Sequence, residues 1–118
     1  MPGKLTTHVL DTGHGKPASG LKIELCKIER EGTATLKTVV TNVEGRTDEP
    51  LLEGDDLLVG VYEIVFHVGE YFAHLYGDVT RPRFLDKVPV RFGVSDHNAN
   101  YHIPLIVSRF GYSTYRGS

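Results

Sequence analysis

The chain has 118 residues, of which 40% are hydrophobic and 24% are charged, a size and composition typical of one globular domain rather than a disordered segment. Thirteen Lys and Arg residues against fifteen Asp and Glu residues give a net charge of -2, which supplies no broad positive field for nucleic acid or an anionic membrane. The single cysteine, Cys26, excludes an internal disulfide and a zinc site built from several cysteines. No apolar run is long enough for a signal peptide or a membrane span. We therefore expect one soluble, cytoplasmic domain over residues 1–118, with no nucleic-acid or membrane partner.

Alternating apolar and polar residues recur at short intervals in the first half of the chain, which is typical of β-strands. The predicted strands here are residues 5–11, 21–30 and 33–42, with a short edge strand around residues 51–52. In the second of these strands the apolar face changes near Lys27 and Ile28, where we expect a β-bulge.

The second half of the chain contains the one segment with helical spacing. Residues 60–68 carry apolar side chains on both faces, which predicts a central strand. In residues 70–76 apolar side chains recur at a spacing of four, which predicts a short helix. Three more strands are predicted at residues 88–95, 101–108 and 111–115.

Seven or eight short strands with one short helix predict an all-β fold, a Greek-key sandwich of two sheets. Alternation also predicts which way the side chains point. His8 shares a face with Thr6 in the first strand, and His102 shares a face with Pro104 in the strand over residues 101–108. If the aliphatic residues that alternate with each histidine in its own strand fill the core, both histidines face outward.

The six histidines are candidates for different roles. His14 and His97 lie in turns, where exposure to solvent is the simpler interpretation, and His67 and His74 flank the start of the predicted helix, where capping or packing explains them. His8 and His102 lie in the middle of strands, where a covered imidazole needs a polar partner.

Common catalytic signatures are missing from the sequence, including G-x-S-x-G, H-E-x-x-H, the P-loop and G-x-G-x-x-G. Cys26 lies within an alternating strand and is interpreted as a small buried hydrophobe rather than a nucleophile. A zinc site that uses His8, His97 and His102 stays an alternative, although strand spacing gives no i, i+2 or i, i+4 pair of histidines.

Three parts of the chain carry a family resemblance. They are residues 5–11 followed by Gly15, Pro17 and Ala18; residues 42–46; and residues 101–105 with 110–118. Together they resemble the 5-hydroxyisourate hydrolases, the transthyretin-related enzymes of purine catabolism. The ending Tyr115-Arg116-Gly117-Ser118 is the most specific mark, since hormone-carrying transthyretins lack it.

The resemblance implies a transthyretin-like sandwich whose edge-to-edge dimers stack into a homotetramer, with active sites in the channel between dimers. It implies hydrolysis of the cyclic amide of 5-hydroxyisourate to 2-oxo-4-hydroxy-4-carboxy-5-ureidoimidazoline in urate degradation, with no cofactor and no metal. The alternative is a carrier of a hormone or another apolar ligand, which is disfavoured because charged groups in an apolar channel would lack partners.

The resemblance also assigns the site residue by residue. The expected catalytic residues are His8, Arg46, His102 and Ser118. The expected substrate-binding residues are Arg46, Tyr115, Arg116, Gly117 and Ser118. An imidazole is suited to deprotonating water, and the permanently charged guanidinium is suited to binding carbonyl oxygens and to lowering the pKa of a nearby imidazole. Which histidine is the base stays open, and for Arg116 an ion pair is weighed equally with substrate contact.

Overall fold

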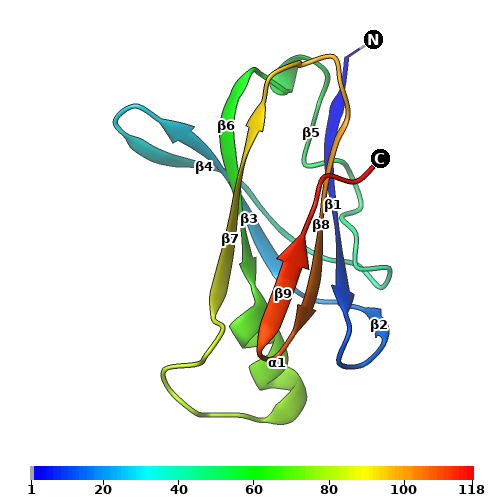
Figure 1. The fold of residues 1–118 in the computed structure, drawn as a ribbon, viewed down its shortest axis with the longest axis vertical. Coiled ribbons are helices and arrows are strands. Elements are labelled where there is room, and N and C mark those ends of the chain that lie inside the picture. The colour runs from blue at the N-terminus through cyan, green and yellow to red at the C-terminus, as the bar shows by residue number, and fades with distance from the viewer. Residues whose placement is uncertain (1) are drawn as a thin grey trace.

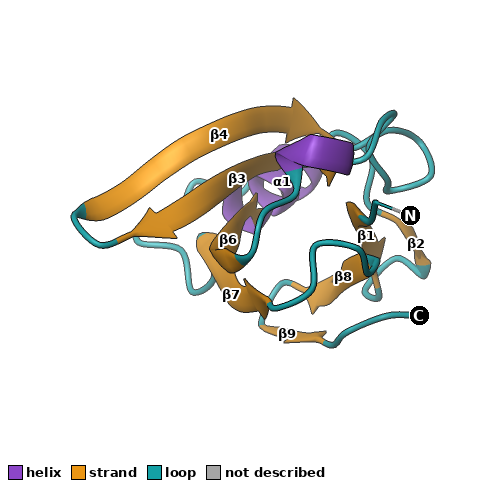
Figure 2. Cartoon of the chain, turned by 90° about the horizontal axis from the view of Figure 1, so that it is seen from above, coloured by secondary structure: helices purple, strands orange, loops and turns teal. Residues whose placement is uncertain are grey.

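Two β-sheets face each other in the structure, a computed structural model that describes residues 2–118 (Figures 1 and 2). In this part of the chain the first sheet contains, in spatial order, β2 (Lys16–Pro17), β1 (Lys4–Asp11), β8 (Tyr101–Ser108) and β9 (Gly111–Thr114), and β5 (Leu52–Glu53) also pairs with β1. The second sheet contains, in order, β4 (Gly32–Val40), β3 (Lys22–Glu29), β6 (Gly60–His67) and β7 (Lys87–Val94). The helix α1 (Val68–Tyr76) follows β6, and a single 3-10 turn covers Gly54–Asp56.

The core lies between the sheets and follows from the alternation of each strand. In β1, Thr6, His8 and Leu10 are partly buried, whereas Leu5 and Val9 are fully buried. From the other sheet, Tyr62, Ile64 and Phe66 of β6 fill the same layer. Each such side chain contributes about 1.5–3 kcal/mol of burial free energy, so the alternation fixes which face of each strand turns inward. Among residues 2–118, no helix is both long and apolar enough to cross a bilayer.

The parallel pairing of β1 with β8 joins residues almost a full chain length apart. Its register runs from Leu5 opposite Tyr101 to Asp11 opposite Val107. Within this register Thr6 lies opposite His102, and His8 lies opposite Pro104. Figure 1 shows the two strands side by side, with the C-terminal segment leaving β9 along the outside of the same sheet. The pairing places side chains from both ends of the chain on one surface.

Most of the predicted elements are confirmed, including the central position of residues 60–67 between two strands and the helix, which begins at Val68. The short edge strand predicted around residues 51–52 is confirmed as β5, and the one strand not predicted is β2; each has two residues. The predicted bulge position is wrong: the register between β3 and β4 shifts between Leu25 and Cys26, where Leu36 of β4 is the unpaired residue. Because the extra residue belongs to the partner strand, β3 keeps its own alternation: its pairing with β6 is continuous from Ile23 to Ile28, and Lys27 lies on the same face as Leu25, over the ring of Tyr62.

Candidate functional site

His8 and Thr6 project from the outer surface of the first sheet. Both side chains are partly buried, whereas the alternate residues of β1 are buried in the core. This confirms the outward orientation predicted for His8. An imidazole on this face is accessible to a ligand and is shielded in part by its neighbours on the sheet.

His102 arrives on the same surface from β8, and its side chain is also partly buried. Its Nδ1 atom lies 2.8 Å from the Oγ1 atom of Thr6, the residue opposite it in the parallel ladder. The buried residues Ile103 and Leu105 confirm that the other face of β8 belongs to the core. His102 therefore has the polar partner that a covered histidine requires.

Arg46 is held beside His8 by a tight turn. The side-chain oxygen of Asn42 accepts hydrogen bonds from the backbone N–H groups of Glu44 and Arg46, at 2.9 and 3.2 Å. Gly45 has a φ of 74°, and a Cβ atom there would lie 2.4 Å from the carbonyl oxygen of Val9. Only glycine permits so close an approach to β1 in this conformation. The turn thereby pairs the backbone of Arg46 with that of His8 in a single antiparallel β-bridge.

Pro104 explains why the C-terminal segment leaves the sheet and returns. Strand β9 pairs with β8 as far as Thr114 opposite Leu105, and Gly117 opposite His102 keeps the same register. Pro104 stands between these pairs and has no N–H to donate, so the ladder is interrupted there. The hydroxyl of Thr114 donates to the Pro104 carbonyl at 2.7 Å instead.

Gly117 brings the end of the chain onto the His102 side chain. Its N–H donates to the His102 carbonyl at 2.7 Å. A Cβ atom on Gly117 would lie 2.5 Å from Cδ2 of His102 and 3.2 Å from Cγ, closer than side chains pack. The missing side chain of Gly117 is thus the space that the imidazole occupies, and Ser118 follows directly beyond it.

Burial and positive charge act together on His102. Burial is the largest cause that lowers the pKa of His102, followed by the positive charge of Arg46 and then by His8. Each of these disfavours the imidazolium form. The predicted effect of Arg46 on a nearby imidazole is thus present, with burial as the larger influence. At neutral pH His102 holds a lone pair that can accept a proton.

Arg116 points to the other side of the sheet from His102. Its guanidinium lies 4.3 Å from the ring centre of Tyr101 and donates to the carbonyl oxygen of Asn100 at 3.1 Å. The hydroxyl of Tyr101 in turn accepts N–H groups of Ser95 and Asp96. These contacts tie the C-terminal segment to the loop before β8. Within one chain, the structure brings Arg116 together with this loop and not with the histidines.

The remaining histidines have other partners or lie in solvent. His14 lies in a turn and bonds the buried carboxylate of Asp11 at 2.6 Å. His67 is buried and hydrogen-bonded to Glu24, and this hydrogen bond is the largest cause that lowers the pKa of Glu24. His74 and His97 are exposed. His8 and His102 are therefore the pair that shares one face with an arginine.

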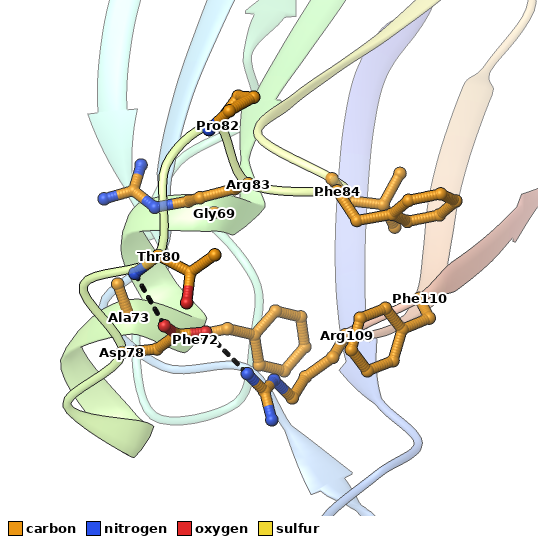
Figure 3. A pocket seen from close by; sticks show the side chains of 11 residues that line it. Gly69, Phe72, Ala73, Asp78, Thr80, Pro82, Arg83, Phe84, Arg109 and Phe110 are labelled. Atoms are coloured by element: carbon orange, nitrogen blue, oxygen red, sulfur yellow. Dashed lines mark hydrogen bonds and ion pairs between the residues drawn. The ribbon is translucent and has the colours of Figure 1, made fainter.

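A cavity of about 630 Å³ lies away from these histidines, between α1, the following loop and the turn from β8 to β9 (Figure 3). Its charged side chains are paired: Arg109 bonds Asp78 at 2.7 Å, and Arg83 bonds Asp86 at 2.8 Å. Phe110, on its rim, is 67% exposed. This arrangement offers apolar surface and no unpaired base or nucleophile among the residues drawn.

The sequence reasoning missed Thr6 as a partner of His102 and Pro104 as the residue that interrupts the C-terminal ladder. Alternation assigns residues to faces and gives no information on which strands are neighbours. The signal available in the sequence was Pro104 itself, because a proline within a strand cannot donate a ladder hydrogen bond and so predicts an interruption of the pairing.

Residues 5–117 match the model of the family described as the HIUase/Transthyretin family. "5-hydroxyisourate hydrolase 2" of Rhizobium meliloti is 52% identical, over 98% of this chain and 97% of its own length. The structure of Klebsiella pneumoniae 5-hydroxyisourate hydrolase is 29% identical with a TM-score of 0.81, over 98% of this chain and 99% of that chain. The crystal structure of (S)-allantoin synthase is 43% identical with a TM-score of 0.92 over 99% of this chain, which spans 44% of that chain.

Proposed function

The chain belongs to the HIUase/transthyretin family, and we propose that it hydrolyses 5-hydroxyisourate in urate degradation with His8, Arg46, His102 and Ser118 as its catalytic residues. The observation that carries the assignment is the meeting of three chain segments on one face of the first sheet. The backbone of Arg46 forms a β-bridge with that of His8, and the backbone of Gly117 forms one with that of His102. The direct test is the ultraviolet decay of freshly prepared 5-hydroxyisourate in the presence of the protein.

In this reaction a water molecule adds to a ring carbonyl. His102 takes a proton from this water molecule, and His8 helps to position the water. The new C–O bond forms, the ring C–N bond breaks, and the imidazolium returns the proton to the leaving nitrogen. Such proton transfer accelerates a reaction by roughly 10²- to 10⁴-fold. The side chains of the chain itself carry each proton transfer in this scheme, and the proposal includes no cofactor and no metal.

Arg46 binds the substrate carbonyls and stabilises the negative charge that develops on oxygen. Its guanidinium presents five donors and stays charged at every physiological pH. Gly117 lets the C-terminal segment approach the imidazole, and Ser118 then brings a hydroxyl to the same place. Tyr115, which is 58% exposed, forms a wall of the substrate pocket. The contacts of Arg116 favour a role in holding this segment over direct substrate contact.

Arg46 contributes to the pH dependence of the site, because its charge lowers the pKa of His102. The variant Arg46→Gln is expected to raise the pKa of His102 relative to wild type, because a positive charge beside the imidazole is removed. The acid limb of the pH–rate profile then moves to higher pH. A titration of the His102 C2–H signal by NMR measures this change without relying on the residual activity of the variant.

The matched control is Arg30→Gln, which removes an exposed arginine beyond the end of β3. This variant should leave the His102 titration unchanged. The difference between wild type and Arg46→Gln should also shrink at high salt, because exposed charges are screened. An unchanged His102 titration in Arg46→Gln at low salt would contradict the assigned interaction.

We also propose that the chain forms a homotetramer in the cytoplasm, with edge-to-edge dimers that stack over the outer face of the first sheet. Strands β7 and β9 are outer edges of their sheets, and open edges need protection from uncontrolled pairing. Phe84 and Phe110 are 75% and 67% exposed, and their ring centres lie 6.0 Å apart near these edges. A second copy would cover these rings, and a stacked dimer would enclose the partly exposed histidines.

Light scattering of the wild-type protein is expected to give four times the mass of one chain. The variant Phe84→Asp should form smaller species, because it places a charge in the apolar contact. Leu58→Asp, which changes another exposed apolar residue, is the control and should keep the wild-type mass. A wild-type protein with the mass of one chain and full activity would contradict the assembly.

A further inference from the structure

Thr6 and His102 make a side-chain contact that the catalytic assignment does not use. They are opposite each other in the parallel ladder of β1 and β8, and both project from the outer face of the sheet. The Thr6 Oγ1 atom lies 2.8 Å from Nδ1 of His102, an ordinary hydrogen-bond distance. The contact joins a residue near the N-terminus to one near the C-terminus, so it depends on the fold.

We propose that Thr6 is a positioning residue for hydrolysis: its hydroxyl oxygen accepts a hydrogen bond from Nδ1–H of His102 and so keeps the lone pair on Nε2. This inference rests on the proposed role of His102. Neutral imidazole has one N–H and one lone pair, and the hydrogen bond made by one nitrogen determines the state of the other. With Nδ1 acting as the donor, Nε2 is the nitrogen that takes a proton from water.

The ring of His102 is held on two sides. Thr6 fixes the Nδ1 edge, and the backbone of Gly117 packs against the opposite edge at Cδ2, the carbon next to Nε2. The N–H of Gly117 also bonds the His102 carbonyl. This arrangement places Nε2 at the side of the ring where the C-terminal end of the chain lies. A base that is held in this way needs little reorganisation before proton transfer.

The charges near the ring favour its neutral form. Arg46, from the turn beside β1, and His8, from β1 itself, are the charged and titratable groups that lower the pKa of His102, after burial. A neutral ring makes the choice of tautomer decisive. If Thr6 instead donated to Nδ1, Nε2 would carry the proton, and His102 would act as a donor to substrate and not as a base.

Thr6→Val tests the positioning role, because valine has nearly the same shape and cannot hydrogen-bond. We expect kcat to fall about five- to tenfold, the range of one neutral hydrogen bond, with KM nearly unchanged. Thr6→Ser restores the hydroxyl and should restore most of kcat. Thr12→Val is the matched control, since Thr12 bonds the Val107 carbonyl at 3.2 Å at the other end of the same strand pair. A wild-type kcat in Thr6→Val, or no recovery in Thr6→Ser, would overturn the proposal.

A second measurement reads the tautomer in the wild-type protein. In ¹⁵N-histidine-labelled protein at neutral pH, His102 should show a protonated Nδ1 and an unprotonated Nε2, and Thr6→Val should lose this preference. A protonated Nε2 in wild type would refute the proposed tautomer. His102→Ala separates the two levels of inference: if it stays fully active, the proposed site is wrong, whereas an inactive His102→Ala with a fully active Thr6→Val refutes only the role of Thr6.

Discussion

Replacing His102 by alanine is expected to lower kcat for 5-hydroxyisourate hydrolysis by roughly 10²- to 10⁴-fold, the usual contribution of a general base. His102 is partly buried, bonded to Thr6 and bridged to Gly117, so the substitution removes the group that the surrounding residues position. His102→Gln should lose a similar factor, because an amide nitrogen or oxygen does not accept a proton at neutral pH. The initial rate of ultraviolet decay at several substrate concentrations gives kcat and KM separately.

His74→Ala is the matched control for the loss of a histidine, since His74 is exposed on α1. It should keep wild-type kinetics. The melting temperature of each variant shows whether a lower rate comes from the site or from unfolding. Wild-type kcat in both His102→Ala and His102→Gln would remove His102 from the mechanism.

The second large effect is expected from Gly117→Ala, although it adds a single methyl group. The new Cβ atom would meet Cδ2 of His102 at 2.5 Å, so either the ring or the C-terminal segment must move. A displacement of about 1 Å at a reacting group can cost on the order of 10²-fold in rate. We expect a loss of this size, close to that caused by deleting residues 115–118. Stability should change little, because this segment contributes no side chain to the core.

Gly111→Ala provides the control for this substitution within β9. Its Cβ atom would lie 3.9 Å from Oγ of Ser108, an ordinary contact, so activity should be unchanged. Full activity in Gly117→Ala would show that the close approach to His102 has no role in hydrolysis. A crystal structure of that variant would show whether the imidazole or the chain end is displaced.

The orientation of the two key histidines is predictable from the sequence. His8 and His102 alternate with residues that are apolar or buried, and a strand that buries one face must turn the other outward. The structure confirms both orientations and the two-sheet sandwich. The helix over residues 68–76 was predictable for a similar reason, because the apolar spacing of residues 70–76 matches one helical face.

The neighbours of those histidines were not predictable from periodicity. The pairing of β1 with β8 joins residues 6 and 102, and no local pattern specifies a partner at that separation. The C-terminal motif shows a similar limit. In the sequence its four residues form one unit, whereas in the structure Gly117 packs on His102 and Arg116 turns to Tyr101 on the opposite side. The bulge was misplaced because its extra residue, Leu36, lies in the partner strand.

Titration of the protein with urate, observed through the six histidine C2–H signals in NMR, tests the central assignment most directly. Urate is a purine related to the substrate, and single His→Gln variants assign each signal. The signals of His8 and His102 should move together as urate binds, while those of His14, His67, His74 and His97 should stay in place. Saturable shifts confined to those other four histidines, with His8 and His102 unmoved, would contradict a site on the outer face of β1 and β8.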